Sequence, residues 1–343
     1  GGNGGAVDNA VPFADYPAML NRSFVLVLAA ACGANQSSPI AADAVAVPPD
    51  AAIDAPLPTP DPLSLAAEVS QTELISTIRD LEDMGSRYTF GGGDEVARDY
   101  LARRLTALGL PVELDQFTVN SEPANNIIAR KEGAVDPSVV FIFSAHYDST
   151  STVPMTDAPG ADDNATGVAA VLEAARILAP RAFKYSLWFV LTAAEEQGSL
   201  GSAHMAKWLM RDGVDVRGVI APDMIGYWPL GEGDALDILG DAGSTQLGAR
   251  MAGFAQQLGV AHKTWVQHDY CYGDDHTNFQ EAGFPAISPM DCVEAHNVAE
   301  SGEETPHYHE PSDRLETLHM PFTAKVAGVI VATFADLGEA VEQ

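Results

Sequence analysis

Hydrophobic residues recur from residue 63 onward with two kinds of spacing, which predict alternating strands and helices. Short apolar runs rich in β-branched and aromatic residues predict strands over residues 112–119, 126–130, 139–145, 186–192, 219–223, 235–239 and 284–289. Apolar positions three and four residues apart predict helices over residues 65–81, 94–108, 164–178, 199–210, 244–258 and 321–341. Strands that alternate with helices build a mixed, mostly parallel sheet flanked by helices on both faces. We therefore predict a single α/β domain over residues 63–343.

The segment before this domain has the composition of a linker. Seven of the chain's 22 prolines fall within the 25 residues 38–62, mixed with Ala and Asp. Such a segment cannot bury enough apolar surface to fold. We expect residues 33–62 to be a disordered tether.

The first 32 residues resemble an upstream extension followed by an export signal. Asn21 and Arg22 precede eight apolar residues, 24–31, which are too few to span a bilayer but suit the apolar region of a secretory signal. The small residues before Cys32 resemble a bacterial lipobox, with Ala29 where leucine is usual. If Cys32 is lipidated, the protein is anchored to a membrane; if not, it is cleaved after Ala31 and secreted to the periplasm or the exterior.

Charge and cysteine content narrow the classes of partner. The chain has 18 Lys and Arg against 48 Asp and Glu, a formal net charge of −30. This excess disfavours nucleic acid and anionic membranes as partners and suits solubility in a salty or extracellular setting. Three cysteines are too few for a disulfide scaffold. We expect a globular, monomeric protein with no nucleic-acid partner.

Chemically active side chains stand at the end of the apolar run 139–145. His146 and Asp148 follow it directly, at the carboxyl end of a strand, where α/β sheets bind ligands. Side chains two apart on an extended chain share a face, so Asp148 could orient His146 toward a metal. Asp163 precedes the helix predicted from Asn164. Taken alone, Asp163 could equally be a helix cap and His146 a structural histidine.

Three further strands or loops end in similar groups. Glu195 and Glu196 follow an apolar strand, where adjacent like charges are costly without a cation. Asp223 ends another apolar run, and His309 lies in a polar segment before the last helix. Two histidines and three carboxylates, with no thiolate, suit two zinc ions, with manganese or cobalt as substitutes.

The motifs HYDS, GADDNATG, AAEEQGSLGS, PDMIGY, DDHTNFQEAGFPA and HEPSDRL resemble those of the M28 zinc aminopeptidases in both order and spacing. The similarity extends from about Leu65 to the C-terminus and includes SRYTFGGG and NIIARKEG. It implies a zinc exopeptidase fold and hydrolysis of the N-terminal peptide bond of peptides with a free amine. It also implies roles for seven residues: two zinc ions held by His146, Asp163, Glu196, Asp223 and His309, Glu195 as general base, and Asp148 as the orienter of His146.

Within this resemblance Asp163 is the bridging ligand, His146 and Asp223 complete one zinc, and Glu196 and His309 the other. His309 is preferred over His307 because it stands four residues before Asp313, as the family's last ligand stands before its aspartate. Tyr270 or Tyr272 could stabilise the oxyanion, but this segment departs from the family's pattern in the placement of its cysteines. Cys271 and Cys292 could form a disulfide in an oxidising compartment or stay as free thiols.

Three alternatives stay open. The pair Asp275-His276 also resembles part of the sequence pattern of glutaminyl cyclases. These enzymes are transferases on a related fold that use one zinc. A carboxypeptidase or dipeptidase would need a basic residue for a substrate carboxylate, and Arg314 is a candidate. A non-catalytic binding domain is the third, although every expected ligand and the base are present.

Overall fold

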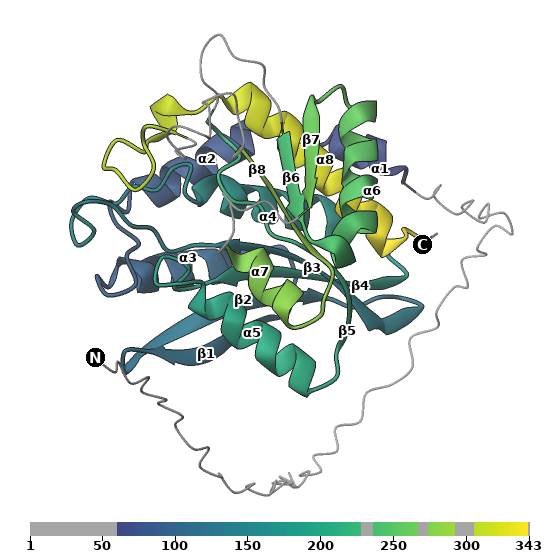
Figure 1. Ribbon diagram of the computed structural model, residues 1–343, viewed down its shortest axis with the longest axis horizontal. Helices are drawn as coiled ribbons and strands as arrows, with labels where there is room; N and C mark the ends of the chain where they lie inside the picture. Colours follow the sequence, from purple (N-terminus) through teal and green to yellow (C-terminus); the bar gives the residue numbers. More distant parts are fainter. Residues whose placement is uncertain (1–59, 228–235, 267–273, 292–304, 342–343) are drawn as a thin grey trace, which may run out of the picture. The chain divides into compact units, whose positions relative to one another are not determined.

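The computed structural model describes residues 60–227, 236–266, 274–291 and 305–341. The predicted export signal, Cys32, Tyr270, Cys271, Tyr272 and Cys292 lie outside these ranges. The described residues form an eight-stranded sheet in the order β1-β2-β4-β3-β5-β8-β6-β7 (Figure 1). The strands are β1 (Val112–Val119), β2 (Glu122–Lys131), β3 (Asp136–His146), β4 (Tyr185–Thr192), β5 (Asp215–Ile220), β6 (Leu236–Gly240), β7 (His262–Val266) and β8 (Ala286–Met290).

The middle of the sheet is parallel and its edges are mixed. Strands β4, β3, β5 and β8 run parallel, whereas β1 with β2, β2 with β4, and β6 with β8 are antiparallel. The helices are α1 (Pro62–Ala66), α2 (Gln71–Glu82), α3 (Gly93–Ala107), α4 (Ala165–Leu178), α5 (Leu200–Arg211), α6 (Thr245–Gln257), α7 (Asp275–Glu281) and α8 (Met320–Gly338). The predicted mixed α/β architecture is confirmed.

Alternate side chains of β3 enter different halves of the core. Phe141 and Phe143 pack in the cluster formed with α4 and α8, while Val140 and Ile142 pack in the cluster formed with α5 and α7. This is the period of two expected of a strand buried on both faces. Helices therefore cover both faces of the sheet (Figure 1).

Helix α8 lies in the larger of these clusters. Among the described residues it alone is long and apolar enough to cross a membrane, yet most of its length is buried inside the domain. Phe334 on α8 makes edge contacts with Phe143 and Phe189 of the sheet, with ring centroids 5.7 Å apart in each pair. We interpret α8 as the central core helix on this face.

The predicted helix over residues 65–81 is wrong as one element. The chain forms α1 and α2, separated at Ala67 to Ser70, because Ser70 adopts an extended conformation and caps α2 by accepting the N–H of Glu73. The short strand β7 and the seven-residue helix α7 were not predicted. The strand predicted over residues 219–223 begins earlier, at Asp215, and ends at Ile220.

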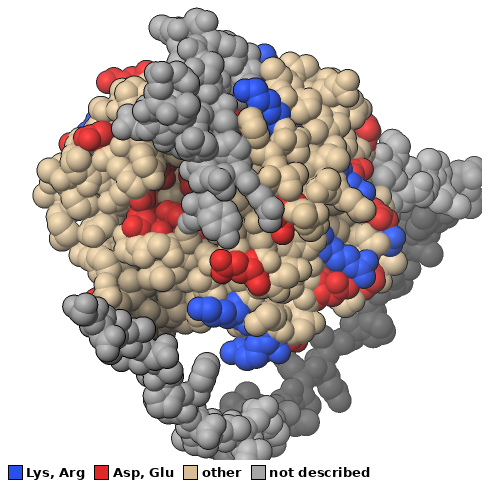
Figure 2. All heavy atoms as spheres, viewed as in Figure 1, with Lys and Arg blue, Asp and Glu red and all other residues tan. Residues whose placement is uncertain are grey.

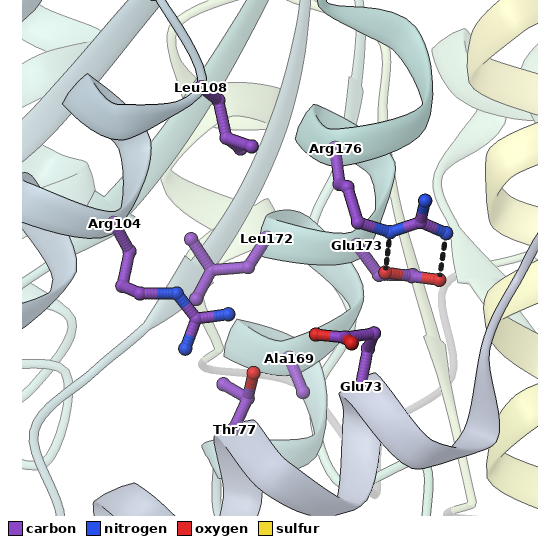
Figure 3. Close-up of a pocket in the computed structure, with 8 residues that line it drawn as sticks. All are labelled: Glu73, Thr77, Arg104, Leu108, Ala169, Leu172, Glu173 and Arg176. Atoms are coloured by element: carbon purple, nitrogen blue, oxygen red, sulfur yellow. Dashed lines mark hydrogen bonds and ion pairs between the residues drawn. The ribbon is translucent and has the colours of Figure 1, made fainter.

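Glu173 connects α4 to the start of α2 and also pairs with Arg176 on its own helix (Figure 3). Glu173 on α4 accepts the backbone N–H of Ser70 at 2.6 Å and pairs through both oxygens with Arg176. Glu73, Thr77 and Arg104 line the same cavity, whose volume of about 40 Å³ admits water but no organic ligand. This end of α4 is structural, which leaves its N-terminal end for the site.

Candidate metal centre and active site

The predicted ligands lie at the carboxyl ends of the parallel strands and in two loops beside them. His146 is the last residue of β3, Glu196 follows β4, and Asp223 follows β5. Asp163 comes just before α4, and His309 lies in the loop before α8. Parallel strands direct the residues that follow them to one edge of a sheet, which explains the convergence of His146, Glu196 and Asp223. The two loops bring Asp163 and His309 to the same edge.

Asp163 occupies the centre of this group. Its Oδ1 lies 3.2 Å from Nε2 of His146, and its Oδ2 lies 3.3 Å from Nε2 of His309. The Nε2 atom of His146 also lies 3.4 Å from Oδ1 of Asp223. On the other side, Nε2 of His309 lies 3.0 Å from Oε2 of Glu196. One carboxylate therefore joins two clusters, each with one histidine and one further carboxylate.

Each cluster has the composition of a zinc site. The potential ligand atoms of His146, Asp163 and Asp223 lie within 4.8 Å of one another, and so do those of Asp163, Glu196 and His309. Among the described residues, Oε1 of Glu196 is buried without a hydrogen-bond partner. A buried acceptor without a donor is costly unless a cation lies beside it. The donor set of nitrogen and oxygen atoms thus fits divalent zinc.

Asp148 connects the two glutamates to His146. Its carboxylate accepts the N–H of Glu195 at 3.1 Å, the N–H of Glu196 at 3.3 Å and the hydroxyl of Thr89 at 3.2 Å. The Nδ1 atom of His146 lies 3.2 Å from the carbonyl oxygen of Asp148 and 3.6 Å from its carboxylate. The predicted orienting residue is therefore adjacent to the ring, with its carbonyl closer than its carboxylate.

The carboxylates and histidines alter one another's proton affinity. Burial disfavours the charged ring of His309, but its hydrogen bonds to Asp163 and Glu196 outweigh that effect and raise its pKa to about 10. Burial likewise opposes charge on His146, yet Asp223, Asp148 and Asp163 raise its pKa well above the ordinary value. Despite burial, the same two histidines hold the pKa of Asp163 below its usual range.

The pKa values of the other carboxyl groups in the two clusters and of Glu195 are raised. Burial raises the pKa of Glu195 and of Asp223 well above the usual carboxyl range, although His146 opposes both shifts. Burial, followed by the nearby charge of Asp163, raises the pKa of Glu196 to about 7. Without a cation the site holds protons, so a divalent ion would replace them.

Two further aspartates fix the backbone of the site. Asp313 accepts the N–H groups of Asp162 and Asp163, at 2.9 and 3.0 Å. Asp162 accepts the N–H groups of Gly226 and Tyr227, at 2.8 and 2.9 Å. The loops that carry Asp163, Asp223 and His309 are thereby tied together.

Arg87 lies beneath the site and was not predicted from the sequence. It is fully buried, and its guanidinium donates to the carbonyl oxygens of Leu81, Tyr147, Pro159 and Gly160. The carbonyls of Tyr147, Pro159 and Gly160 belong to the segments that bear His146 and Asp163. Its positive charge also lies near the carboxylates of Asp313, Asp163, Asp148 and Glu196. Arg87 lies in the motif SRYTFGGG, which is part of the family resemblance, but the motif does not show which carbonyl groups the arginine contacts.

Backbone strain gathers around the same residues. Ala194, Ser199, Met224 and His309 all have φ between 47° and 59°, in the left-handed region that non-glycine residues rarely adopt. Each stands within four residues of a predicted ligand or base, or is itself one. Such strain persists where the surrounding contacts fix the backbone, and it is common at functional sites.

The other histidines near the site have different partners. His307 donates to or accepts from Ser312 through Nδ1 at 2.9 Å, and its ring meets the ring of Tyr227 edge-on. His276 is buried on α7 with Nδ1 3.2 Å from Asp274. Neither belongs to the two clusters, so the geometry favours His309 over His307 as the candidate ligand.

Figure 2 shows Asp and Glu side chains gathered in a hollow on one face of the molecule.

Comparison with known proteins identifies related sequences and folds. Residues 126–334 match the model of peptidase family M28. A probable zinc metalloprotease of Pyrenophora teres f. teres is 28% identical over 348 residues, covering 83% of this chain and 70% of that protein.

Solved structures share the fold at low identity. The LapA aminopeptidase of Legionella pneumophila has a TM-score of 0.68 and 19% identity, covering 81% of this chain and 74% of its own. BSAP, a zinc aminopeptidase from Bacillus subtilis, has a TM-score of 0.68 and 17% identity over 79% and 96% of the two chains. A glutaminyl cyclase from Fimbriiglobus ruber has a TM-score of 0.63 and 20% identity over 78% and 95%.

Proposed function

Because the chain belongs to peptidase family M28, we propose that it is a zinc-dependent aminopeptidase that removes the N-terminal residue of peptides. The observation that carries the proposal is the position of Asp163 between two clusters of zinc-type ligands. His146 and Asp223 would hold one ion with Asp163, and Glu196 and His309 would hold the other.

Peptide hydrolysis at this site needs a base as well as an electrophile. When bound, zinc supplies Lewis-acid chemistry, since it polarises a carbonyl group and makes water more acidic. Glu195 is not a member of either cluster but is adjacent to Glu196, and its backbone is fixed by Asp148. We assign it to accept the proton of the attacking water and then to donate a proton to the departing amine.

Selection of a free N-terminus requires a group that recognises the substrate amine. Asp163, Glu196 and Asp223 would be neutralised by two zinc ions, so we assign this recognition to one of the ions or to a neighbouring carboxylate that binds no metal. The aminopeptidase activity named for two of the structural relatives is consistent with this assignment.

A glutaminyl cyclase is the second candidate, favoured by the fold shared with such an enzyme and by Asp275 and His276 on α7. Against it, the chain offers two complete ligand clusters, whereas the cyclase interpretation requires one zinc. The carboxypeptidase alternative has lost support, because the guanidinium of Arg314 is paired with Glu82 and Asp157.

The proposal is tested with a leucine peptide that has a free amine and with its N-acetylated form. We expect the purified protein to cleave only the free-amine peptide, to lose activity on chelation and to regain it with added zinc. Cleavage of both peptides, or of neither, would contradict an aminopeptidase. Formation of a cyclised product from an N-terminal glutamine peptide would favour the cyclase.

A further inference from the structure

A tight turn joins Glu195 to Ser199 at the entry to α5. The hydroxyl of Ser199 donates to Oε1 of Glu195 at 2.7 Å, and its backbone N–H donates to the carbonyl oxygen of Glu195 at 2.7 Å. The same serine thus contacts both the side chain and the main chain of the glutamate. A donor on a carboxylate oxygen restricts rotation of the side chain and stabilises its charged form.

Ser199 is itself held in place from two helices. Its carbonyl oxygen accepts the side-chain N–H of Asn278 on α7 at 3.0 Å and the hydroxyl of Ser202 on α5 at 3.0 Å. Asn278 also donates to the hydroxyl oxygen of Ser202 at 2.9 Å. Ser199 is only 3% exposed. Its hydroxyl therefore projects from a fixed backbone.

The conformation of Ser199 indicates why a hydroxyl is present. Its backbone is left-handed, with φ 53° and ψ 40°, a conformation that glycine adopts with less strain. Ser199 occupies the N-cap position of α5, but its side chain makes no capping hydrogen bond to the helix. The hydroxyl points back to Glu195 instead of forward into α5. A strained serine whose hydroxyl does not cap its helix is explained by this second contact.

Both the backbone and the carboxylate of Glu195 are therefore held by hydrogen bonds. Asp148 accepts its backbone N–H at 3.1 Å, and Ser199 holds its carbonyl and its Oε1. We infer that Ser199 is a positioning residue, which orients the carboxylate of Glu195 for proton transfer. This inference rests on the proposed function, in which Glu195 is the base.

Substitutions at Ser199 separate the hydroxyl from the backbone conformation. Ser199→Gly removes the hydroxyl and relieves the left-handed strain, so we expect unchanged or higher thermal stability with kcat lowered about tenfold, the effect of one charge-assisted hydrogen bond. KM should change less than about twofold, since Ser199 acts through Glu195. Ser199→Thr keeps the hydroxyl but adds a branched carbon at positive φ, so it should be less stable while retaining most of kcat.

The matched control is Ser138→Ala. Ser138 also donates to a carboxylate, Asp136, at 2.6 Å, but it is exposed at the start of β3. This variant should match the native protein in kcat and KM. A kcat that follows thermal stability across the Ser199 variants, or a Ser199→Gly variant with native kcat, would overturn the inference.

Crystal structures of the native protein and Ser199→Gly supply a readout that does not require activity. We expect the carboxylate of Glu195 to be ordered in the native protein and to rotate or become disordered in the variant. An unchanged carboxylate position would overturn the inference even if no peptide were cleaved. A native protein that cleaves no peptide, with a displaced Glu195 in the variant, would instead refute the proposed function alone.

Discussion

The Nε2 atom of His309 lies 3.3 Å from Oδ2 of Asp163. The other oxygen of that carboxylate faces His146, which is 163 residues from His309 in the sequence. Asp163 therefore links the strand-end half of the site to the half contributed by the loop before α8. Metal binding in both halves therefore depends on this shared carboxylate and on the groups that hold it.

Replacing the assigned base should separate catalysis from metal binding. Glu195→Gln keeps the size of the side chain and an oxygen for the hydroxyl of Ser199, but the amide cannot accept a proton. We expect kcat to fall about 10²- to 10⁴-fold with zinc content unchanged. The control is Glu339→Gln, which removes only a surface ion pair with Lys184 and should leave kcat at the native value. A Glu195→Gln variant with native kcat would exclude Glu195 as the base.

Loss of Arg87 should destabilise the fold even without metal. Arg87→Met would leave the carbonyls of Tyr147, Pro159 and Gly160 buried without their donor and remove a positive charge near the carboxylates. We expect the free energy of unfolding to fall by about 3–5 kcal/mol. Urea titration of the metal-free protein measures this.

Two companion variants test the cause of that loss. Arg87→Lys keeps the charge but has fewer donors, so it should lie between the native protein and Arg87→Met. Arg211→Met removes an exposed pair with Asp212 and should change stability by less than about 0.5 kcal/mol. Equal effects of Arg87→Met and Arg211→Met would show that the buried contacts contribute nothing.

Zinc binding should release protons at neutral pH. Hydrogen bonds to carboxylates raise the pKa of His309 to about 10, and that of His146 is also raised, so both rings are protonated in the metal-free site. Zinc binds the neutral ring, and the protonated forms compete with it. Zinc affinity should therefore rise as pH increases from 6 toward the pKa of these rings.

Calorimetry in buffers of different ionisation enthalpy measures this release at pH 7. We expect at least about one proton per zinc ion bound. Identical heats in all buffers would show that the histidines are already neutral, contrary to the predicted linkage.

The sequence predicted the centre of the molecule better than its edges. Residues 139–145 form an almost continuous apolar run, which is typical of a strand covered on both faces. Strand β3 ends at His146, as this run predicts. The convergence of His146, Glu196 and Asp223 followed from strand ends alone. By contrast, β7 lies at an edge of the sheet with partly exposed side chains, so its hydrophobic signal is weak. Helix α7 has seven residues, too few for a clear period.

The supporting contacts could not be predicted for a different reason. Arg87 bonds to carbonyl oxygens between 6 and 73 residues away, and backbone carbonyls have no sequence signature. The break between α1 and α2 depends on Ser70, whose backbone N–H donates to the carboxylate of Glu173 on α4. The role of Ser199 requires a left-handed backbone that nothing in the residue type specifies. Tertiary contacts decide each of these.

The zinc content of the purified protein and of two variants tests the shared-ligand account most directly. Elemental analysis should give two zinc ions per chain for the native protein, about one for His309→Ala, and fewer than one for Asp163→Ala, since only Asp163 belongs to both clusters. A native content of one zinc per chain, or an Asp163→Ala variant that loses no more zinc than His309→Ala, would contradict a centre in which Asp163 joins two ions.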